Sequence, residues 1–177
     1  MLLKDFVRAH KTVTGLGAWT DKRMTKNPSK FPLWRPKGTK LGSAWRWRVV
    51  EFSVLDVTSA LRTGRMLVAY RLDKQEFLSY VGVDELTGNG TLVIACLEFH
   101  GTHAGWHLHA ACASHDRGCV GRVRHAAMRR LPGGGRHHRQ TTFVIDDDAA
   151  LRRAAETFNF DELTSAPQPQ GLLDFGS

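Results

Sequence analysis

The chain has 177 residues, of which 42% are hydrophobic, and its formal net charge is +8. This length suits one domain with a single core and is short for two full domains. The sequence contains no apolar run of about 18 residues, and no basic N-terminal segment leads into a hydrophobic block. These features exclude an obvious membrane span or secretory signal, so we expect a cytoplasmic protein without a membrane partner.

The three cysteines also indicate a reducing compartment. They are Cys96, Cys112 and Cys119, which lie close together in the sequence. An odd and clustered set does not resemble the disulfide framework of a small secreted domain.

The positive charge is unevenly distributed along the chain. Residues 1–50 carry 12 Lys and Arg against two Asp, and residues 117–139 carry seven Arg without any acid. Residues 146–177 reverse the sign, with seven acids against two Arg. Because each cation placed on a phosphate releases condensed counterions, two basic blocks favour nucleic acid as a partner. A solvated basic surface that only aids solubility is the alternative.

Residues 1–48 are predicted to form a weakly ordered basic arm, because Lys, Pro and Gly are mixed with Trp and no hydrophobic period is sustained. Interleaved Trp and Arg side chains can stack on unpaired bases and follow the backbone of a single strand. The alternative is that the Trp side chains dock on the protein core. The residues concerned are Trp45, Arg46, Trp47 and Arg48.

The first elements after the arm are predicted from their composition. Strands are expected over "RVVEFSVLDV" (48–57) and "RMLVAYRLD" (65–73), which are rich in Val, Leu and aromatic residues. A short helix is expected over "DKQEFLSYVGVDEL" (73–86), because Phe77, Leu78 and Val81 have helical spacing after a capping Asp73.

The second half predicts a hairpin followed by further alternation of helix and strand. The strand "TLVIACLEFH" (91–100) is expected to pair with "GWHLHAAC" (105–112) across "GTHAG". Then come a basic helix "CVGRVRHAAMRRL" (119–131), a loop "PGGGRHHRQ" (132–140), a strand "TTFVID" (141–146) and a helix "DDAALRRAAETF" (147–158) with an acidic first turn.

This order predicts an α+β fold with a largely antiparallel sheet and helices packed mainly on one face. The expected organisation is an arm over residues 1–48, a domain over 49–164 and a flexible tail over 165–177.

The hairpin gathers residues that bind metals. His107 and His109 alternate onto one face of their strand. If the turn is centred between residues 102 and 103, Glu98 lies opposite His107 and Cys96 lies opposite His109, and directly opposite residues project on the same face. Two imidazoles and a carboxylate then form a set that leaves positions open on a divalent metal.

Two other interpretations of the same stretch remain open. Half-buried histidines at a period of two can simply be hydrogen-bonded within the fold. A structural zinc site is also compatible with the segment. Its ligands would come from His107, His109, Cys112, His115 and Cys119, whose spacing matches no CxxC-type knuckle.

The stretch "LEFHGTHAGWHLHA" resembles the HUH endonucleases, which include rolling-circle replication initiators and relaxases. The likeness rests on "GWHLHA", with Glu98 nine positions ahead of His107, and is specific over residues 91–113. Over residues 66–160 the likeness is one of element order, and it implies an HUH/RRM-like arrangement.

The resemblance implies that His107, His109 and Glu98 hold Mg²⁺ or Mn²⁺, with His100 as a substitute ligand and Zn²⁺ as the alternative metal. In such enzymes the metal polarises the scissile phosphate of a single-stranded nucleic acid, and a tyrosine attacks phosphorus.

The tyrosine of the family has no obvious equivalent, because this chain has none after Tyr80. Tyr70 is expected in a strand, and the helix after the motif offers Phe158 and Phe160 instead. Three alternatives stay open: Tyr80 is the catalytic nucleophile, water is the nucleophile, or the protein binds nucleic acid without cutting it.

Two further classes of protein would use histidines of this chain. A cupin metal motif would need a Glu shortly after the second histidine, where Ala113 and Ser114 stand. A metal-independent ribonuclease would use His137 or His138 as acid or base, with Arg136 or Arg139 on the phosphate. A phosphate-binding loop without catalysis is the simpler interpretation of that segment.

The sequence therefore favours a metal-dependent nucleic-acid-processing protein that nicks or transfers strands, with a non-catalytic DNA- or RNA-binding module as the alternative. Its oligomeric state is not indicated. Further nucleic-acid contacts are expected from Arg122, Arg124, Arg129, Arg130, Arg136 and Arg139.

Overall fold

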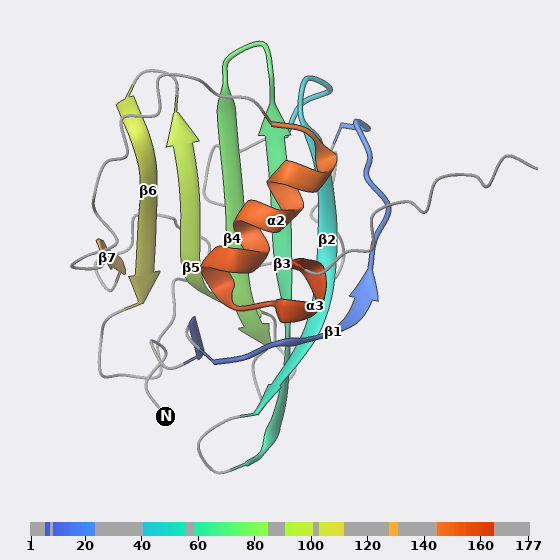
Figure 1. Cartoon of the computed structure of the whole chain (residues 1–177), viewed down its shortest axis with the longest axis vertical. Coiled ribbons are helices and arrows are strands. Elements are labelled where there is room, and N and C mark those ends of the chain that lie inside the picture. The colour runs from blue at the N-terminus through green and yellow to red at the C-terminus, as the bar shows by residue number, and fades with distance from the viewer. Residues whose placement is uncertain are drawn as a thin grey trace, which may run out of the picture.

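The computed structural model describes residues 6–7, 9–23, 41–55, 59–84, 91–100, 103–111, 128–130 and 145–164, with 103–111 and 128–130 described by their backbone pairing. Seven strands of this part of the chain form one sheet in the order of the sequence, and all neighbours are antiparallel (Figure 1). The elements are β1 (Thr12–Leu16), β2 (Arg46–Leu55), β3 (Leu61–Arg71), β4 (Glu76–Asp84), β5 (Thr91–His100), β6 (His103–Ala111), β7 (Met128–Arg130), α2 (Asp147–Phe158) and α3 (Asp161–Thr164).

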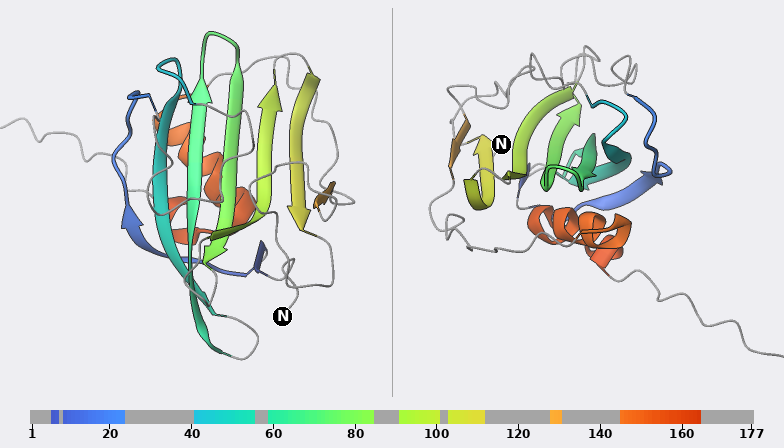
Figure 2. Two further views of the ribbon diagram at one scale, coloured as in Figure 1. Left: turned by 180° about the vertical axis from the view of Figure 1, so that it is seen from behind. Right: turned by 90° about the horizontal axis from the view of Figure 1, so that it is seen from above.

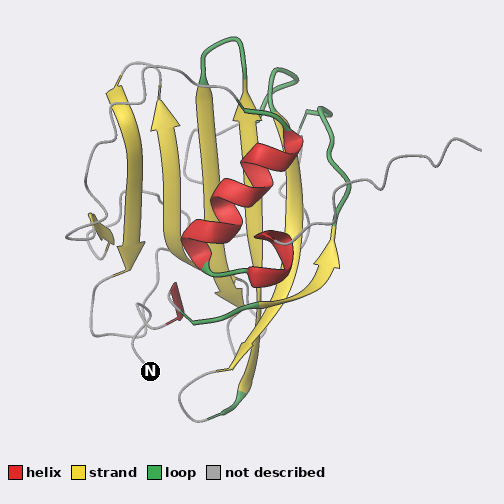
Figure 3. Cartoon of the chain, viewed as in Figure 1, coloured by secondary structure: helices red, strands yellow, loops and turns green. Residues whose placement is uncertain are grey.

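Both α2 and α3 lie on the same side of the sheet, as the view from above shows (Figure 2). The coarse prediction of an α+β fold with an antiparallel sheet and helices on one face is therefore confirmed for the described residues. From β1 to β7 the described strands follow one another as a meander (Figure 3). An RRM-like order needs a helix between the strands that precede the hairpin, and the segment expected to supply it is a strand.

The helix predicted over residues 73–86 is wrong, because residues 76–84 form β4. A tight turn at residues 72–75, with Gln75 at a φ of 51°, replaces the expected helix cap. All seven interior residues of β4 are buried, so this strand is covered on both faces. A strand of that kind shows a continuous apolar run instead of alternation, and such a run is easily mistaken for a helix.

The predicted N-terminal arm is also corrected in its described part. Residues 12–16 form the edge strand β1, which pairs with β2, and β2 itself begins at Arg46, before the expected domain boundary. The sequence "TVTGL" is short and half polar, as suits an edge strand, and this is why its pattern was inconspicuous.

The basic segment after the hairpin contains a short strand. Residues 128–130 pair with β6, which contradicts a helix at these positions, while residues 112–127 and 131–144 lie outside the described part. The expected strand at 141–146 is represented only by Ile145 and Asp146, which lead directly into α2. The expected tail, residues 165–177, also lies outside the described part.

Helix α2 has the predicted bounds, and both of its ends are capped. Asp146 precedes the helix, and its side chain accepts a 2.8 Å hydrogen bond from the Ala149 amide. Asn159 follows it in a left-handed conformation with a φ of 62°, and its amide donates to the Ala155 carbonyl. These caps satisfy backbone groups that a helix of this length leaves without partners.

The buried side of α2 packs against one face of the sheet, which we call the helix face. Phe52 of β2 meets Phe160, which follows α2, edge to face with ring centroids 5.2 Å apart, and Phe158 of α2 is fully buried. Gly64 of β3 lies directly opposite Phe52 in the register, and the aromatic ring covers the space where a side chain would stand.

The other face of the sheet, the far face, carries the residues that alternate with these. Trp47, Leu67, Tyr80, Cys96 and Glu98 belong to it by strand register. Tyr80 is 3% exposed and Cys96 is fully buried, so the middle of the far face is as well covered as the helix face.

A buried lysine connects β1 to the end of α2. The Lys11 amine donates to the carbonyls of Val7, Ala9 and Phe158 at 3.1, 2.8 and 2.6 Å. Cations are favoured at a helix C-terminus, where carbonyl groups lack partners. Burial nevertheless lowers the pKa of Lys11 from 10.5 to about 7, although the three carbonyls favour the charged form.

Substitution of Gly64 by Ala should destabilise the fold. The added methyl group would lie 2.5 Å from Cζ of Phe52 and closer still to the Gly82 carbonyl oxygen, and overpacking of this kind costs roughly 1–3 kcal/mol. Urea unfolding measures the loss. Gly42→Ala is the matched control, because no atom lies within 4 Å of its added group; an equal effect of the two changes would contradict the packing described here.

The free energy of unfolding should rise with pH in the alkaline range because of Lys11. Since its pKa is 10.5 in the unfolded chain and about 7 in the fold, the unfolded chain binds more protons between these values. Stability contributed by this group therefore increases from about pH 7 to 10.5 and is constant outside that window. Urea titrations of wild type and Lys11→Met across this range measure the difference. Identical pH profiles would show that Lys11 keeps its charge in the fold.

Candidate functional site

The register between β5 and β6 places the hairpin residues as the sequence predicts. Glu98 lies opposite His107, and Cys96 lies opposite His109. The predicted centre of the turn is displaced, because an irregularity after Phe99 brings His100 opposite His103. Since the predicted pairing holds at Glu98, the alternative register that would have made His100 a substitute ligand does not occur.

Two rows of residues run across the far face at this point. One row contains Tyr80 of β4, Cys96 of β5, His109 of β6 and Arg130 of β7. The next row contains Leu78, Glu98 and His107. Residues that are directly opposite in antiparallel strands share a face and have Cβ atoms about 4.5–5.5 Å apart. The two histidine positions are therefore adjacent to a carboxylate, a thiol and a guanidinium position.

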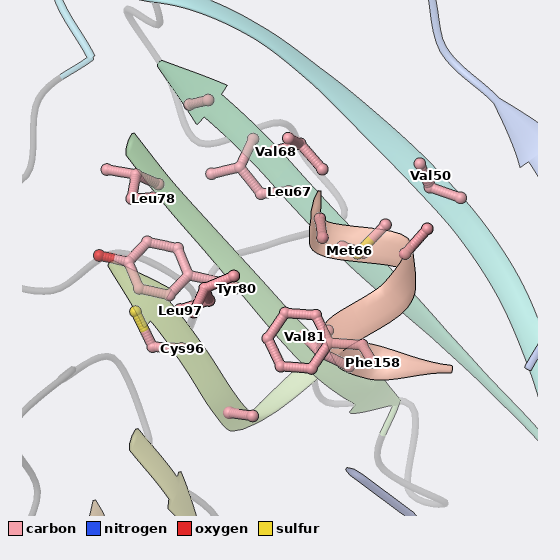
Figure 4. Close-up of a cluster of buried hydrophobic side chains, with 14 of the residues drawn as sticks. Val50, Met66, Leu67, Val68, Leu78, Tyr80, Val81, Cys96, Leu97 and Phe158 are labelled. Carbon is pink, nitrogen blue, oxygen red and sulfur yellow. The ribbon is translucent and has the colours of Figure 1, made fainter. Parts of the chain in front are cut away.

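The described side chains of these rows form a gradient from core to solvent. Cys96 is fully buried, and its Sγ donates to Oε1 of Glu98 at 3.3 Å. Glu98 is partly exposed. Tyr80 is opposite Cys96 on the neighbouring strand β4, and the close-up shows its ring beside the Cys96 sulfur (Figure 4). The carboxylate of Glu98 is therefore accessible to water, whereas the neighbouring thiol of Cys96 is not.

The donor set at these positions fits a divalent metal. Imidazole nitrogen, carboxylate oxygen and thiolate sulfur are the groups with which proteins bind such ions, and the rows bring one or two of each together. Among residues whose side chains the structure describes, no group of three His, Cys, Asp or Glu residues forms a metal site. The candidate set includes His107 and His109, which are placed by strand register.

Tyr80, the sequence candidate for the nucleophile, lies on the same face as the candidate ligands but in a strand and not in a helix. Only 3% of its surface is exposed. A phosphate cannot approach a phenol that is enclosed in this way without displacement of neighbouring groups. Tyr70 lies on the helix face, where its hydroxyl donates to Oδ1 of Asp147 at 2.8 Å.

The tryptophans expected to stack on bases are occupied within the protein. Trp45 is 9% exposed, and the Arg71 guanidinium stands 5.1 Å from the centre of its ring. The Trp47 indole donates to the Lys22 carbonyl at 2.9 Å. These contacts favour the docked interpretation of the two side chains.

Arg46 and Arg48 also have partners in the chain. Arg46 forms a double hydrogen bond with Asp147 at 2.6 and 2.5 Å, and Arg48 donates twice to the Gly17 carbonyl while covering the Trp19 ring. Both arginines stand on the helix face, away from the rows that carry the histidines. In the described part of the predicted arm, Arg46 thus bonds to the start of α2, whereas Lys11 bonds to its end.

Asp147 accepts hydrogen bonds from both Arg46 and Tyr70. Its pKa reflects these two contacts. Burial opposes ionisation of its carboxyl group, but hydrogen bonds from Arg46 and Tyr70 outweigh burial and hold the pKa of Asp147 below its ordinary value. Burial and the hydrogen bond to Asp147 raise the pKa of Tyr70 to about 12. The pKa of Arg46 is raised, mainly by its own hydrogen bonding to Asp147.

Most of the other sequence candidates lie outside the described residues. Arg129 and Arg130 are placed in β7, and Arg130 is opposite His109. Not described are Cys112, His115, Cys119, Arg122, Arg124, Arg136, His137, His138 and Arg139. The sequence candidates for metal ligands did not include Cys96, although its pairing with His109 was part of the predicted register.

The comparisons with known proteins add no identity. No protein-family model matches the chain, and neither the curated proteins nor the solved structures contain a match. Among the described residues, no helix has the length and apolar character needed to cross a membrane.

Replacement of Arg46 by Gln should lower the stability of the fold, because it removes both hydrogen bonds to Asp147. The midpoint of urea unfolding should fall, and Asp147→Asn should add little in the double variant, since the two residues act as one unit. Arg152→Gln, which changes an exposed arginine of α2, is the control. A loss of nucleic-acid affinity in Arg46→Gln without a change in the midpoint would instead assign Arg46 to ligand binding.

Proposed function

We propose that the protein cleaves a phosphodiester in single-stranded or locally melted nucleic acid, with a divalent metal held on the far face by Glu98, His107 and His109. One observation carries the proposal: the β5–β6 register pairs Glu98 with His107 and puts His109 two positions further along the same strand. The likeness of this hairpin to HUH endonucleases supports the same chemistry, and it concerns the motif rather than the order of the strands.

Three ligands would leave positions on a divalent metal open for a phosphate oxygen and water. A metal in this position supplies Lewis-acid polarisation of a phosphate oxygen and lowers the pKa of a nearby water. The role of the protein is to hold the imidazoles and the carboxylate on adjacent strands of a sheet whose interior is buried on both faces. Such a support keeps the ligand positions rigid.

Positive charge is available where the phosphate would bind. Arg130 is opposite His109 in the register, so the guanidinium position neighbours the metal ligands. Residues 117–139 contribute seven arginines to the chain in all. A guanidinium next to the metal would orient the phosphate by bidentate hydrogen bonds and would balance charge that develops on it during cleavage.

Water is the nucleophile in this proposal. Tyr80 is only 3% exposed, whereas Glu98 of the same face is partly exposed. Attack by water gives two nucleic-acid fragments and no covalent intermediate with the protein. The proposal thus keeps the metal chemistry of the HUH resemblance and not its covalent tyrosine.

Cleavage should depend on Mn²⁺ and be abolished in His107→Ala, because that change removes a ligand from the site. Labelled single-stranded DNA and RNA, incubated with each protein and run on denaturing gels, measure the effect. His10→Ala is the matched control, since His10 is exposed and lies far along the chain from the hairpin. We expect the control to cut like wild type.

Three results would contradict the proposal. A protease-sensitive protein adduct on the cut strand, lost in Tyr80→Phe, would identify Tyr80 as the nucleophile. Tight binding without cutting by wild type and His107→Ala alike would make the chain a non-catalytic binding module. An affinity that does not change from low to physiological salt would exclude a polyanion as the ligand.

A further inference from the structure

We propose that Cys96 is a fourth ligand of the site, so that the site binds Zn²⁺ or a similar transition-metal ion in preference to Mg²⁺. This inference rests on the proposed function, because it extends the same metal site by one residue. It assigns a chemical role to a buried thiol that the motif of two histidines and a glutamate does not use.

The position of Cys96 completes a four-sided arrangement. It is opposite His109, and Glu98 is opposite His107, so the four residues occupy adjacent positions of two paired strands. Opposite residues are about 5 Å apart at Cβ, and residues i and i+2 of one strand are roughly 7 Å apart. Imidazole and carboxylate side chains are longer than a thiol, so residues at the corners of such a rectangle can reach a single ion that lies on the Cys96 side of its centre.

The contact between Cys96 and Glu98 shows that the described half of the arrangement already converges. Sγ of Cys96 donates to Oε1 of Glu98 at 3.3 Å, although the two residues are separated by one position along the strand. The thiol and the carboxylate therefore lean towards each other. A metal ion bound to Cys96 and Glu98 would replace the proton that the thiol now donates to the carboxylate. The carboxylate is already close enough to the sulfur to share a metal ion with it.

Cys96 and Glu98 differ in burial, as expected for a metal site that is closed on one side and open to solvent on the other. Cys96 is fully buried, in the same row as buried Tyr80, and Glu98 is partly exposed. A thiolate in such surroundings is costly unless a cation compensates its charge. The sulfur would form the inner wall of the site, and substrate would approach from the side of Glu98.

The chemistry of sulfur determines which metals the site accepts. On binding, the S–H bond of Cys96 is replaced by a sulfur–metal bond, and the proton leaves to solvent. Thiolate and imidazole ligands suit Zn²⁺ and Co²⁺, whereas Mg²⁺ prefers carboxylate, carbonyl and water oxygens. One sulfur, two nitrogens and one carboxylate oxygen would form a tetrahedral zinc set, and expansion to five-coordination would give the substrate phosphate a position while Glu98 stays bound.

Cobalt spectroscopy of the full chain tests the assignment without measuring cleavage. Co²⁺ added to the wild type should give the intense visible bands of a tetrahedral site together with a near-ultraviolet sulfur-to-cobalt charge-transfer band. The charge-transfer band should disappear in Cys96→Ser and in Cys96→Ala. It should persist in the double variant Cys112→Ser/Cys119→Ser, which is the matched control and excludes a structural zinc site built from those cysteines.

A second measurement uses the wild type alone, so that a folding defect in a Cys96 variant does not decide the outcome. X-ray absorption of the zinc-loaded protein should show one sulfur at about 2.3 Å and nitrogen or oxygen ligands at about 2.0–2.2 Å. Circular dichroism of each variant checks that it folds before its cobalt spectrum is compared.

The outcomes separate the inference from the proposed function. Cobalt binding that depends on His107 but lacks a sulfur band would overturn the role of Cys96 and leave the proposed site intact. A sulfur band that is lost only in the Cys112 and Cys119 double variant would also overturn it, in favour of the structural zinc site. The absence of any bound Co²⁺ or Zn²⁺ would overturn the inference, while persistent Mn²⁺-dependent cleavage in the same preparation would retain the proposed function.

Discussion

Backbone pairing between β5 and its two neighbours is the constraint on which the candidate site depends. Leu97 and Phe99 face the helices and are nearly or fully enclosed, whereas Cys96 and Glu98 face the other way. A slip of one residue would exchange these two sets and turn a carboxylate into the apolar core. Packing of Leu97 and Phe99 therefore holds β5 in register, and the fully buried Cys96 adds packing on the other face.

Elements with one buried and one exposed side could be predicted from the sequence, whereas a strand that is buried on both faces could not. Helix α2 was predictable because "DDAALRRAAETF" alternates a buried and an exposed side and begins with acidic residues. The hairpin of β5 and β6 was predictable because its turn is short and its strands are clear. β4 was not, because "EFLSYVGVD" is enclosed on both sides and its apolar residues show no period of two.

The candidate site was predictable to the extent that it depends on register. The turn itself is displaced, but the irregularity after Phe99 leaves Glu98 paired with His107 as expected. The roles of side chains whose partners are distant in the sequence could not be predicted from strand register. Arg46 has the sequence context of a nucleic-acid contact, yet its partner Asp147 is about a hundred positions away. Trp45 is likewise held by Arg71 on the next strand. The composition of a segment shows that it contains Arg and Trp, but it does not indicate which of these side chains are bound to other parts of the protein.

The link between β1 and the end of α2 has a consequence for the order in which the protein folds during synthesis. Lys11 donates to the Phe158 carbonyl, its amide donates to the Asn159 carbonyl, and Glu162 accepts from the Val13 amide on β1. The earliest described strand is thus fastened by residues that are made almost last. On the ribosome the meander from β2 to β6 can assemble from local hairpins, while β1 waits at the edge until the C-terminal helices emerge. The unpaired edge of β2 is exposed for that interval, when it can pair with another chain.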